Sequence, residues 1–246
     1  MNSQLTEFLK LNKEELMKPV PEINWQSLYL KLDENLRSQF TELMLSKKID
    51  PSLYLKNIPK KYLYNSNIDK YAILDHIEEI RSQAFSNCKN LISITIPNSV
   101  ISICESAFYK CRNLLSITIP NSVTSIDDNA FDNCISLTNI NIPNSVTSIE
   151  SHVFYNCTSL KNVTIGNGVT SIGYCAFGNC RSLESITIPD SVTSIRDYAF
   201  ENCGDKLVIN YEGTKADWKK IYNSQSFKNT YFTVNCIDGK IIKKRR

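Results

Sequence analysis

A period of 23 residues constrains this chain more than any other feature of its sequence. Phenylalanine recurs at this interval without an insertion, and a cysteine follows each phenylalanine three residues later. A period of about 20 to 29 residues is typical of solenoids, in which each repeat forms one coil and neighbouring coils bury each other's apolar face. The recurring residues are Phe85, Phe108, Phe131, Phe154, Phe177 and Phe200, with Cys88, Cys111, Cys134, Cys157, Cys180 and Cys203.

Within each unit the pattern L-x-x-I-x-I predicts a short strand. Two β-branched residues at positions i and i+2 point to the same face of a strand. Because the pattern recurs in every unit, we expect successive coils to stack these strands into a parallel sheet. The first β-branched column is Ile94, Ile117, Ile140, Val163 and Ile186, and the second is Ile96, Ile119, Ile142, Ile165 and Ile188.

The rest of each unit predicts a turn, a second extended segment and a compact corner. Proline follows the strand in four units, and Gly166 takes its place in another; either residue ends a strand. The S-V-T-S-I stretch that follows predicts a second short extended segment, and the A-F-x-x-C stretch predicts a tight helical turn. We interpret the recurring cysteines as small buried hydrophobes.

The flanks of the array lack the period, so we expect them to form caps. Both ends of a solenoid expose apolar strands and unpaired backbone groups, which a different sequence must cover. Apolar residues between Asn24 and Lys48 fall near helical spacing, which favours helices in the N-terminal flank. The expected parts are a helical N-terminal domain or cap over residues 1–67, the solenoid over 68–211, and a C-terminal cap with a basic tail over 212–246.

The C-terminal flank contains two local signals. Thr214 and Asp217 are spaced as in a capping box, which predicts a short helix through Trp218 and Ile221. We expect Trp218 to cover the last coil. The stretch 231–242 alternates apolar and polar residues around Asp238-Gly239, which predicts a terminal hairpin.

The charge distribution gives no general bias towards polyanions. The formal net charge is +3, but residues 243–246 are all basic, so the rest of the chain is close to neutral. We interpret this tail as a solvated end, and no other segment is expected to contact nucleic acid. The sequence contains no apolar run of about 18 residues, so no membrane span is predicted.

The start of the chain does not resemble an export signal. Charged residues including Glu7, Lys10 and Glu14 interrupt the stretch that would have to be apolar. The chain has nine cysteines, an odd number, which favours a reducing compartment over a disulfide framework. The sequence as written therefore predicts a cytoplasmic location, with the cell surface or secretion as the alternative.

The units NSVTSIDDNAFDNCISLTNINIP and DSVTSIRDYAFENC, with YEGTKADWKKI after the array, resemble the BspA-type leucine-rich repeats of bacteria and protozoan parasites. The resemblance implies a right-handed solenoid with a concave parallel sheet. Many proteins that resemble this one are surface or secreted adhesins that bind host or matrix proteins. With its flanks, the predicted fold is α/β: a leucine-rich-repeat right-handed solenoid with a parallel β-sheet, a helical N-terminal segment and a C-terminal cap.

No pattern predicts a catalytic residue, a cofactor site or a metal site. No motif places a nucleophile or an orienting acid beside His76 or His152, the two histidines. Cys104 and Cys175 stand outside the cysteine column and are expected to be exposed. Cys180 lies five residues after Cys175, so a metal site is conceivable there, but zinc sites normally join such a pair to a second cysteine pair or a histidine pair, and we favour chance substitution on a variable turn. We therefore predict that the protein is not an enzyme, while an active site within residues 1–60 stays open.

The turns are the better candidates for partner contacts. Solvent-facing strand positions carry small polar residues such as Ser93 and Thr95, without the aromatic and arginine anchors that dominate interface energetics. The turns vary more from unit to unit. The candidate contacts are Tyr109, Arg112, Tyr155, Tyr174, Arg181 and Tyr198.

These features predict a non-enzymatic protein-binding scaffold that acts through the solenoid surface. We expect an intracellular binder, adaptor or inhibitor of a partner protein. A cell-surface or secreted adhesin that binds host or matrix proteins is the alternative. No small-molecule substrate is expected, and the sequence does not indicate the oligomeric state.

Overall fold

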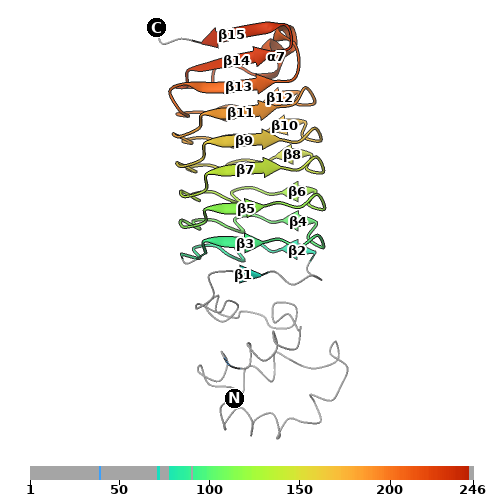
Figure 1. Ribbon diagram of the computed structural model, residues 1–246, viewed down its shortest axis with the longest axis vertical. Helices are drawn as coiled ribbons and strands as arrows, with labels where there is room; N and C mark the ends of the chain where they lie inside the picture. The colour runs from blue at the N-terminus through green and yellow to red at the C-terminus, as the bar shows by residue number, and fades with distance from the viewer. Residues whose placement is uncertain (1–38, 40–70, 73–77, 90, 244–246) are drawn as a thin grey trace, which may run out of the picture. The chain divides into compact units, whose positions relative to one another are not determined.

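The structure is a computed structural model that describes residue 39, residues 71–72, residues 78–89 and residues 91–243. The chain divides into two compact units, Met1–Ile68 and Asp69–Arg246. Apart from residue 39, all of the described residues belong to the second unit, which is drawn in colour in Figure 1. The predicted helical segment within residues 1–67 lies outside the described residues, with residue 39 the exception.

The L-x-x-I-x-I pattern forms one strand in each coil, as predicted. Equivalent residues of neighbouring coils pair in parallel, so that Ile94 lies opposite Ile117 and Ile140 opposite Val163. The pairing is interrupted once, between the strands Ser116–Thr118 and Asn139–Ile142, which belong to separate sheets. The polar residues between them face outward and the β-branched residues are buried. These strands are β1 (Tyr71–Ala72), β3 (Ser93–Thr95), β5 (Ser116–Thr118), β7 (Asn139–Ile142), β9 (Asn162–Ile165), β11 (Ser185–Ile188) and β13 (Leu207–Tyr211).

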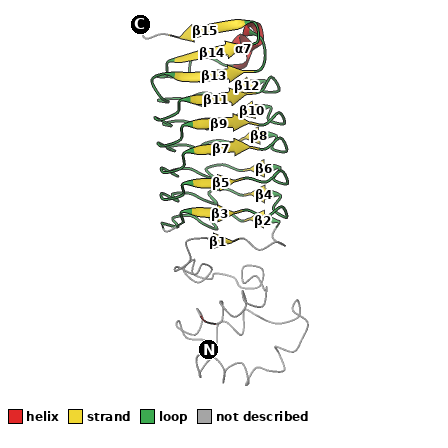
Figure 2. Cartoon of the chain, viewed as in Figure 1, coloured by secondary structure: helices red, strands yellow, loops and turns green. Residues whose placement is uncertain are grey.

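The S-V-T-S-I stretches form a second set of parallel strands, which confirms the second extended segment. In each of these strands the first residue, a serine except for Glu79 in the first coil, is partly or fully exposed and the isoleucine is buried, as in Ser148 and Ile149. Figure 2 shows the two sets of strands running up the solenoid together. The second set is β2 (Glu79–Ile80), β4 (Ser102–Ile103), β6 (Ser125–Ile126), β8 (Ser148–Ile149), β10 (Ser171–Ile172) and β12 (Ser194–Ile195).

A ladder of stacked phenylalanine rings runs through the core of the solenoid. Phe108 and Phe131 lie 5.1 Å apart, centroid to centroid, with their rings within 2° of parallel. The ladder runs from Phe85 and continues past the last repeat, because Phe227 stacks on Phe200 at 4.8 Å. Each ring therefore packs against the ring of the next coil, and Phe227 does so although it lies outside the 23-residue period.

The A-F-x-x-C corner is not a helical turn, so this expectation was wrong. Its amides alternate between two kinds of acceptor: the Ala107 amide donates to Cys104 in the same coil at 3.1 Å, and the Phe108 amide donates to Ala130 in the next coil at 2.8 Å. The φ angle is +58° at both Ser106 and Lys110. These left-handed residues turn every second amide towards the neighbouring coil, which a helix does not allow.

The recurring cysteines are reduced and nearly all buried, as expected. The structure adds that they are hydrogen-bond donors: the Cys111 thiol donates to the Phe85 carbonyl oxygen at 2.9 Å. Burial raises the pKa of these thiols, which keeps them protonated. Outside the column, both cysteines were expected to be exposed, but Cys175 is only 6% exposed and Cys104 is half-buried.

The helix that follows the repeats begins at the predicted cap. In α7 (Lys215–Ile221) the Asp217 amide donates to the Thr214 hydroxyl at 3.2 Å. Trp218 is fully buried, 5.2 Å from Tyr211 and 5.8 Å from Phe227 between ring centroids. The indole thus covers the last coil, as predicted.

The chain after α7 adds another strand to the stack. β14 (Phe232–Cys236) pairs in parallel with β13, with Phe232 opposite Leu207, and β15 (Gly239–Lys243) closes the predicted hairpin against β14. The hairpin turn consists of Ile237 and Asp238, one residue earlier than expected, because Gly239 already pairs with Cys236. One coil without the repeat sequence therefore follows the repeats, at the end drawn in red in Figure 1.

Candidate interaction surface

The corners that follow the second set of strands form a continuous edge along the solenoid. We call this surface the turn edge and define it by residues 104–106, 127–129, 150–152, 173–175 and 196–198. Backbone hydrogen bonds join its successive turns, with the Asn129 amide donating to Ser151 at 3.0 Å and the His152 amide donating to Tyr174 at 2.9 Å. Side chains at equivalent positions of this edge are therefore neighbours in space.

Aromatic side chains gather at the C-terminal half of the turn edge. His152 meets Tyr155 and Tyr174 edge to face, each with ring centroids 5.3 Å apart. Tyr174 in turn meets Tyr198 at 5.6 Å, and Tyr174 is 42% exposed. We call these four residues the aromatic group. They come from three successive coils, so the packing of the coils holds their rings in place.

Two neighbouring features position the outer rings of the aromatic group. A Cβ atom at Gly178 would lie 2.9 Å from the Tyr155 ring, so the absence of a side chain lets that ring lie against the next coil. The Lys228 amine lies 5.1 Å from the centroid of the Tyr198 ring and 3.8 Å from the Glu201 carboxylate. The neighbouring coils on the C-terminal side therefore hold the Tyr155 and Tyr198 rings in place.

Carboxylates gather at the other half of the turn edge. Four of them line a surface hollow of about 310 Å³. The pKa of Asp127 is raised mainly by burial and, to a smaller extent, by the surrounding carboxylates, which include Glu79. Within the described part of the chain, none of these carboxylates forms an ion pair with lysine or arginine. We call Glu79, Glu105, Asp127, Asp128 and Glu150 the acidic group.

His152 connects the two groups. Burial lowers the pKa of its imidazole, and the Asp128 carboxylate opposes this shift. The net shift is downward, so the ring is uncharged at neutral pH. His152 therefore resembles the tyrosines of the aromatic group in two ways: its ring packs against two of theirs, and it is uncharged.

The structure brings together three of the six candidate contacts, Tyr155, Tyr174 and Tyr198. Tyr109 lies instead beside Lys110, whose amine is 4.7 Å from the ring centroid. Arg112 and Arg181 are exposed in the corner beyond the cysteine column, and within the described residues neither of them forms a ring contact or ion pair with the three tyrosines. From the sequence, His152 was considered only as a catalytic candidate, and its place among the tyrosines was missed. No sequence signal indicated it, because Tyr155 and Tyr174 occupy variable positions outside the column of His152.

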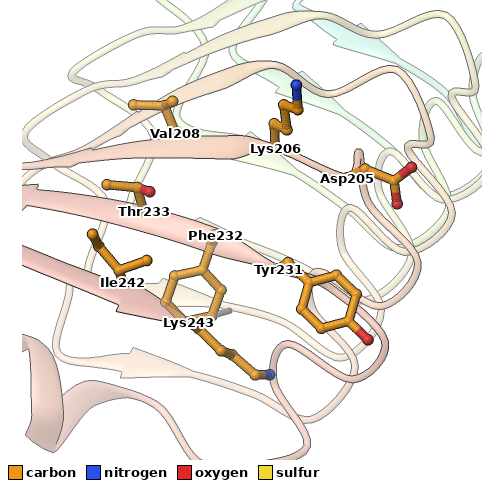
Figure 3. A pocket seen from close by; sticks show the side chains of 8 residues that line it. All are labelled: Asp205, Lys206, Val208, Tyr231, Phe232, Thr233, Ile242 and Lys243. Atoms are coloured by element: carbon orange, nitrogen blue, oxygen red, sulfur yellow. The ribbon is translucent and has the colours of Figure 1, made fainter. Parts of the chain in front are cut away.

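Another hollow, of about 590 Å³, lies on the outer face of β13, β14 and β15. Figure 3 shows Val208, Thr233 and Ile242 in a row across these strands, with Lys206 and Asp205 to one side. The Lys243 amine donates to the Phe227 carbonyl oxygen at 2.9 Å. The hollow brings no set of converging ionisable groups together for acid–base chemistry.

The described residues contain no group of three or more histidine, cysteine, aspartate or glutamate side chains arranged to hold a metal ion. Across the same part of the chain, no helix combines the length and apolar character needed to cross a bilayer.

Comparison with known protein families gives one match. The family model for the BspA type leucine rich repeat region matches residues 78–206 and 124–238, with six copies of the repeat. The matched residues include the turn edge and extend through α7 into β14. No curated protein matches the chain significantly.

Solved structures share the solenoid. A leucine rich repeat protein of T. pallidum is 26% identical with a TM-score of 0.54, over 66% of this chain and 86% of that chain. A leucine-rich repeat protein from Eubacterium ventriosum is also 26% identical, with a TM-score of 0.57, over 67% of this chain and 43% of that chain. The pneumococcal vaccine antigen PcpA is 22% identical with a TM-score of 0.52, over 72% and 44% of the two chains, and shares the fold.

Proposed function

The chain belongs to the BspA-type leucine-rich repeat family, and from this premise we propose that it is a non-enzymatic scaffold that binds a partner protein along its turn edge. The observation that carries the proposal is the aromatic group. Tyrosine is enriched among the residues that dominate binding energy at protein interfaces. Here tyrosines from successive coils meet on one exposed edge of a solenoid whose strands otherwise present small polar residues.

The packing of the coils supports this proposal energetically. A tyrosine side chain has two rotatable bonds, and rings already held by a neighbour lose less conformational freedom when a partner binds. His152, Tyr174 and Tyr198 contact one another in sequence along the edge. A partner that binds these rings therefore loses little of the binding energy to the ordering of the tyrosine side chains.

The chemistry of the described hollows favours binding over catalysis. The hollow beside Tyr174, of about 350 Å³, is lined by Ser194, Ile195, Arg196, Asp197 and Asn223. General acid–base catalysis needs a proton donor or acceptor within hydrogen-bond reach of the reacting group, and triad chemistry needs a nucleophile, a base and an orienting group together. His152 instead makes ring contacts with tyrosines, so its environment supports a packing role.

The test compares two faces of the same scaffold. Full-length protein is immobilised and incubated with extract of the source cell, and bound proteins are quantified by mass spectrometry for wild type and for Tyr174→Ala/Tyr198→Ala. The control is Thr164→Ala/Thr187→Ala, which removes outward-facing side chains of β9 and β11. We expect the amount of captured partner to fall by about tenfold or more with the tyrosine variant and to stay at the wild-type level with the threonine variant. Equal capture by all three proteins would sink the proposal.

We further propose that this binding takes place inside the cell, as an adaptor or inhibitor of the partner. The buried thiols support a reducing compartment, because they act as hydrogen-bond donors to the phenylalanine carbonyls. Fractionation of the source cell with an antibody to the chain tests this location. Recovery at the cell surface or in the medium would favour the adhesin function instead.

A further inference from the structure

One half of the turn edge carries clustered carboxylates, and the other half carries the aromatic rings together with Arg196 and Asp197. Glu105, Asp127, Asp128 and Glu150 come from three successive coils and line one hollow, and the hollow beside Tyr174 follows on the same edge. Arg81 and Arg196 occupy the equivalent positions at the two ends of this edge. The coils between them contribute carboxylates and no lysine or arginine at the turn-edge positions.

The acidic group repels itself in the free protein. The pKa of Asp127 is raised by burial and by the carboxylates of Glu150, Asp128, Glu79 and Glu105, in that order. No cation contributes to this shift. A positively charged ligand placed here would gain attraction from several carboxylates at once and would also relieve their repulsion.

The aromatic group continues the same binding surface for a cation. The faces of tyrosine rings attract ammonium and guanidinium groups, and Lys228 already lies over the Tyr198 ring at 5.1 Å. The uncharged imidazole of His152 lies between the carboxylates and the tyrosines and does not repel a cation at neutral pH. Arg196 lines the hollow beside Tyr174 and Lys228 covers Tyr198, so the favourable contacts for cationic side chains of a partner are the acidic group and the exposed ring of Tyr174.

The dimensions fit an extended peptide segment. Coils stacked about 4.8 Å apart place the Glu105 turn and the Tyr198 turn about 20 Å apart, which is the length of roughly six residues of extended chain. Arginine suits both halves of the edge, because its guanidinium binds carboxylates through two parallel hydrogen bonds and stacks on aromatic rings.

We propose that the partner presents a segment rich in arginine and lysine, which lies along the turn edge with its cationic side chains on the acidic group and against the aromatic group. This inference rests on the proposed function and names the class of partner. It does not follow from the charge of the whole chain, because a formal net charge of +3 would repel a polycation. Attraction must come from the local carboxylates.

The test uses a fluorescein-labelled peptide of alternating arginine and glycine, with alternating glutamate and glycine as the negative probe. Fluorescence anisotropy measures the Kd for full-length protein. We expect the arginine peptide to bind, the glutamate peptide not to bind, and the Kd of the arginine peptide to rise as salt increases from about 50 to 300 mM. Asp127→Asn/Asp128→Asn is expected to raise the Kd by about tenfold or more.

Matched variants separate local recognition from overall charge. Asp205→Asn/Glu212→Gln removes the same two charges from exposed positions outside the turn edge and is expected to change the Kd by less than about twofold. Tyr174→Ala is expected to weaken binding by about fivefold, and Tyr174→Phe to keep it, since both tyrosine and phenylalanine attract cations. Equal weakening by the two charge-removing variants would overturn the proposal.

Two further measurements distinguish this inference from the proposed function. In the capture experiment, loss of the partner with Tyr174→Ala/Tyr198→Ala but full retention with Asp127→Asn/Asp128→Asn would overturn the basic segment and leave the protein-binding scaffold standing. Sedimentation of wild type and of a chain ending at Ile242 tests the basic tail of a second copy as the occupant. If the protein self-associates only when the tail is present, the proposal that a separate partner supplies the basic segment would be overturned.

Discussion

The thiol of Cys157 donates a hydrogen bond to the carbonyl oxygen of Phe131, one coil earlier, with the sulfur 3.3 Å from the oxygen. The same oxygen also accepts the amide of Cys134 at 3.1 Å. Five of the recurring cysteines, Cys111, Cys134, Cys157, Cys180 and Cys203, link two coils in this way, each through the carbonyl oxygen of a phenylalanine of the ring ladder. Burial raises the pKa of the Cys157 thiol well above its ordinary value, so the donor proton is retained.

This hydrogen bond makes a prediction about substitution at Cys157. Alanine removes the sulfur and its donor from a fully buried site and is expected to cost about 1–2 kcal/mol in the free energy of unfolding. Serine is more polar but keeps a donor, so we expect Cys157→Ser to be at least as stable as Cys157→Ala in urea denaturation. A serine variant clearly less stable than alanine would show that only the apolar volume matters.

Trp218 gives a second prediction, because its indole nitrogen is buried without a hydrogen-bond partner in the described structure. Trp218→Phe keeps an aromatic ring among Tyr211, Phe227 and Phe232 and gives up no hydrogen bond, whereas Trp218→Ala leaves a cavity. We expect the alanine variant to lose about 3–5 kcal/mol and the phenylalanine variant clearly less. Thermal unfolding of both measures the difference, and equal losses would argue against this account.

Asp132 gives a prediction about pH. Burial raises its pKa in the folded protein to about 6, against attraction from Lys110 and a hydrogen bond from Asn133. The folded state therefore binds more protons than the unfolded chain between the ordinary pKa of 3.8 and about 6. Stability falls as the pH rises through this window, and the penalty persists at higher pH.

Replacing Asp132 by asparagine removes this penalty. We expect Asp132→Asn to be more stable than wild type at about pH 7.5, by roughly 1–3 kcal/mol, and to show no gain near pH 3.5. Differential scanning calorimetry at the two values measures this, with Asp205→Asn as the exposed control. A gain of the same size at both pH values would point to a cause other than the ionisation of Asp132.

Gly178 and Gly168 give a fourth prediction, because a methyl group would meet different neighbours at the two positions. At Gly178 the new Cβ would lie 2.9 Å from the Tyr155 ring, which can shift, and at Gly168 it would lie 1.9 Å from the Asn144 backbone oxygen, which cannot. We expect Gly168→Ala to lower Tm much more than Gly178→Ala. Similar losses of Tm would contradict the geometry.

The sequence by itself determined the coil. Phenylalanines recur at a constant interval, with β-branched pairs between them. Stacking the repeats as coils with parallel strands buries every apolar column at once. The capping residue Thr214 and the covering role of Trp218 were also readable, because both depend on neighbours close in the chain. Local pattern and constant period were sufficient for these features.

Only the tertiary structure decided how neighbouring coils share their atoms. The corner at Ser106 and Ala107 reads as a helical turn when one repeat is considered alone, but half of its amides bond to the next coil. The extra coil that contains Phe227 was invisible, since its spacing departs from the period although its ring joins the ladder. The contacts of His152 with Tyr155 and Tyr174 likewise form between side chains at variable positions, some of them in different coils. A repeat pattern holds no information about such positions.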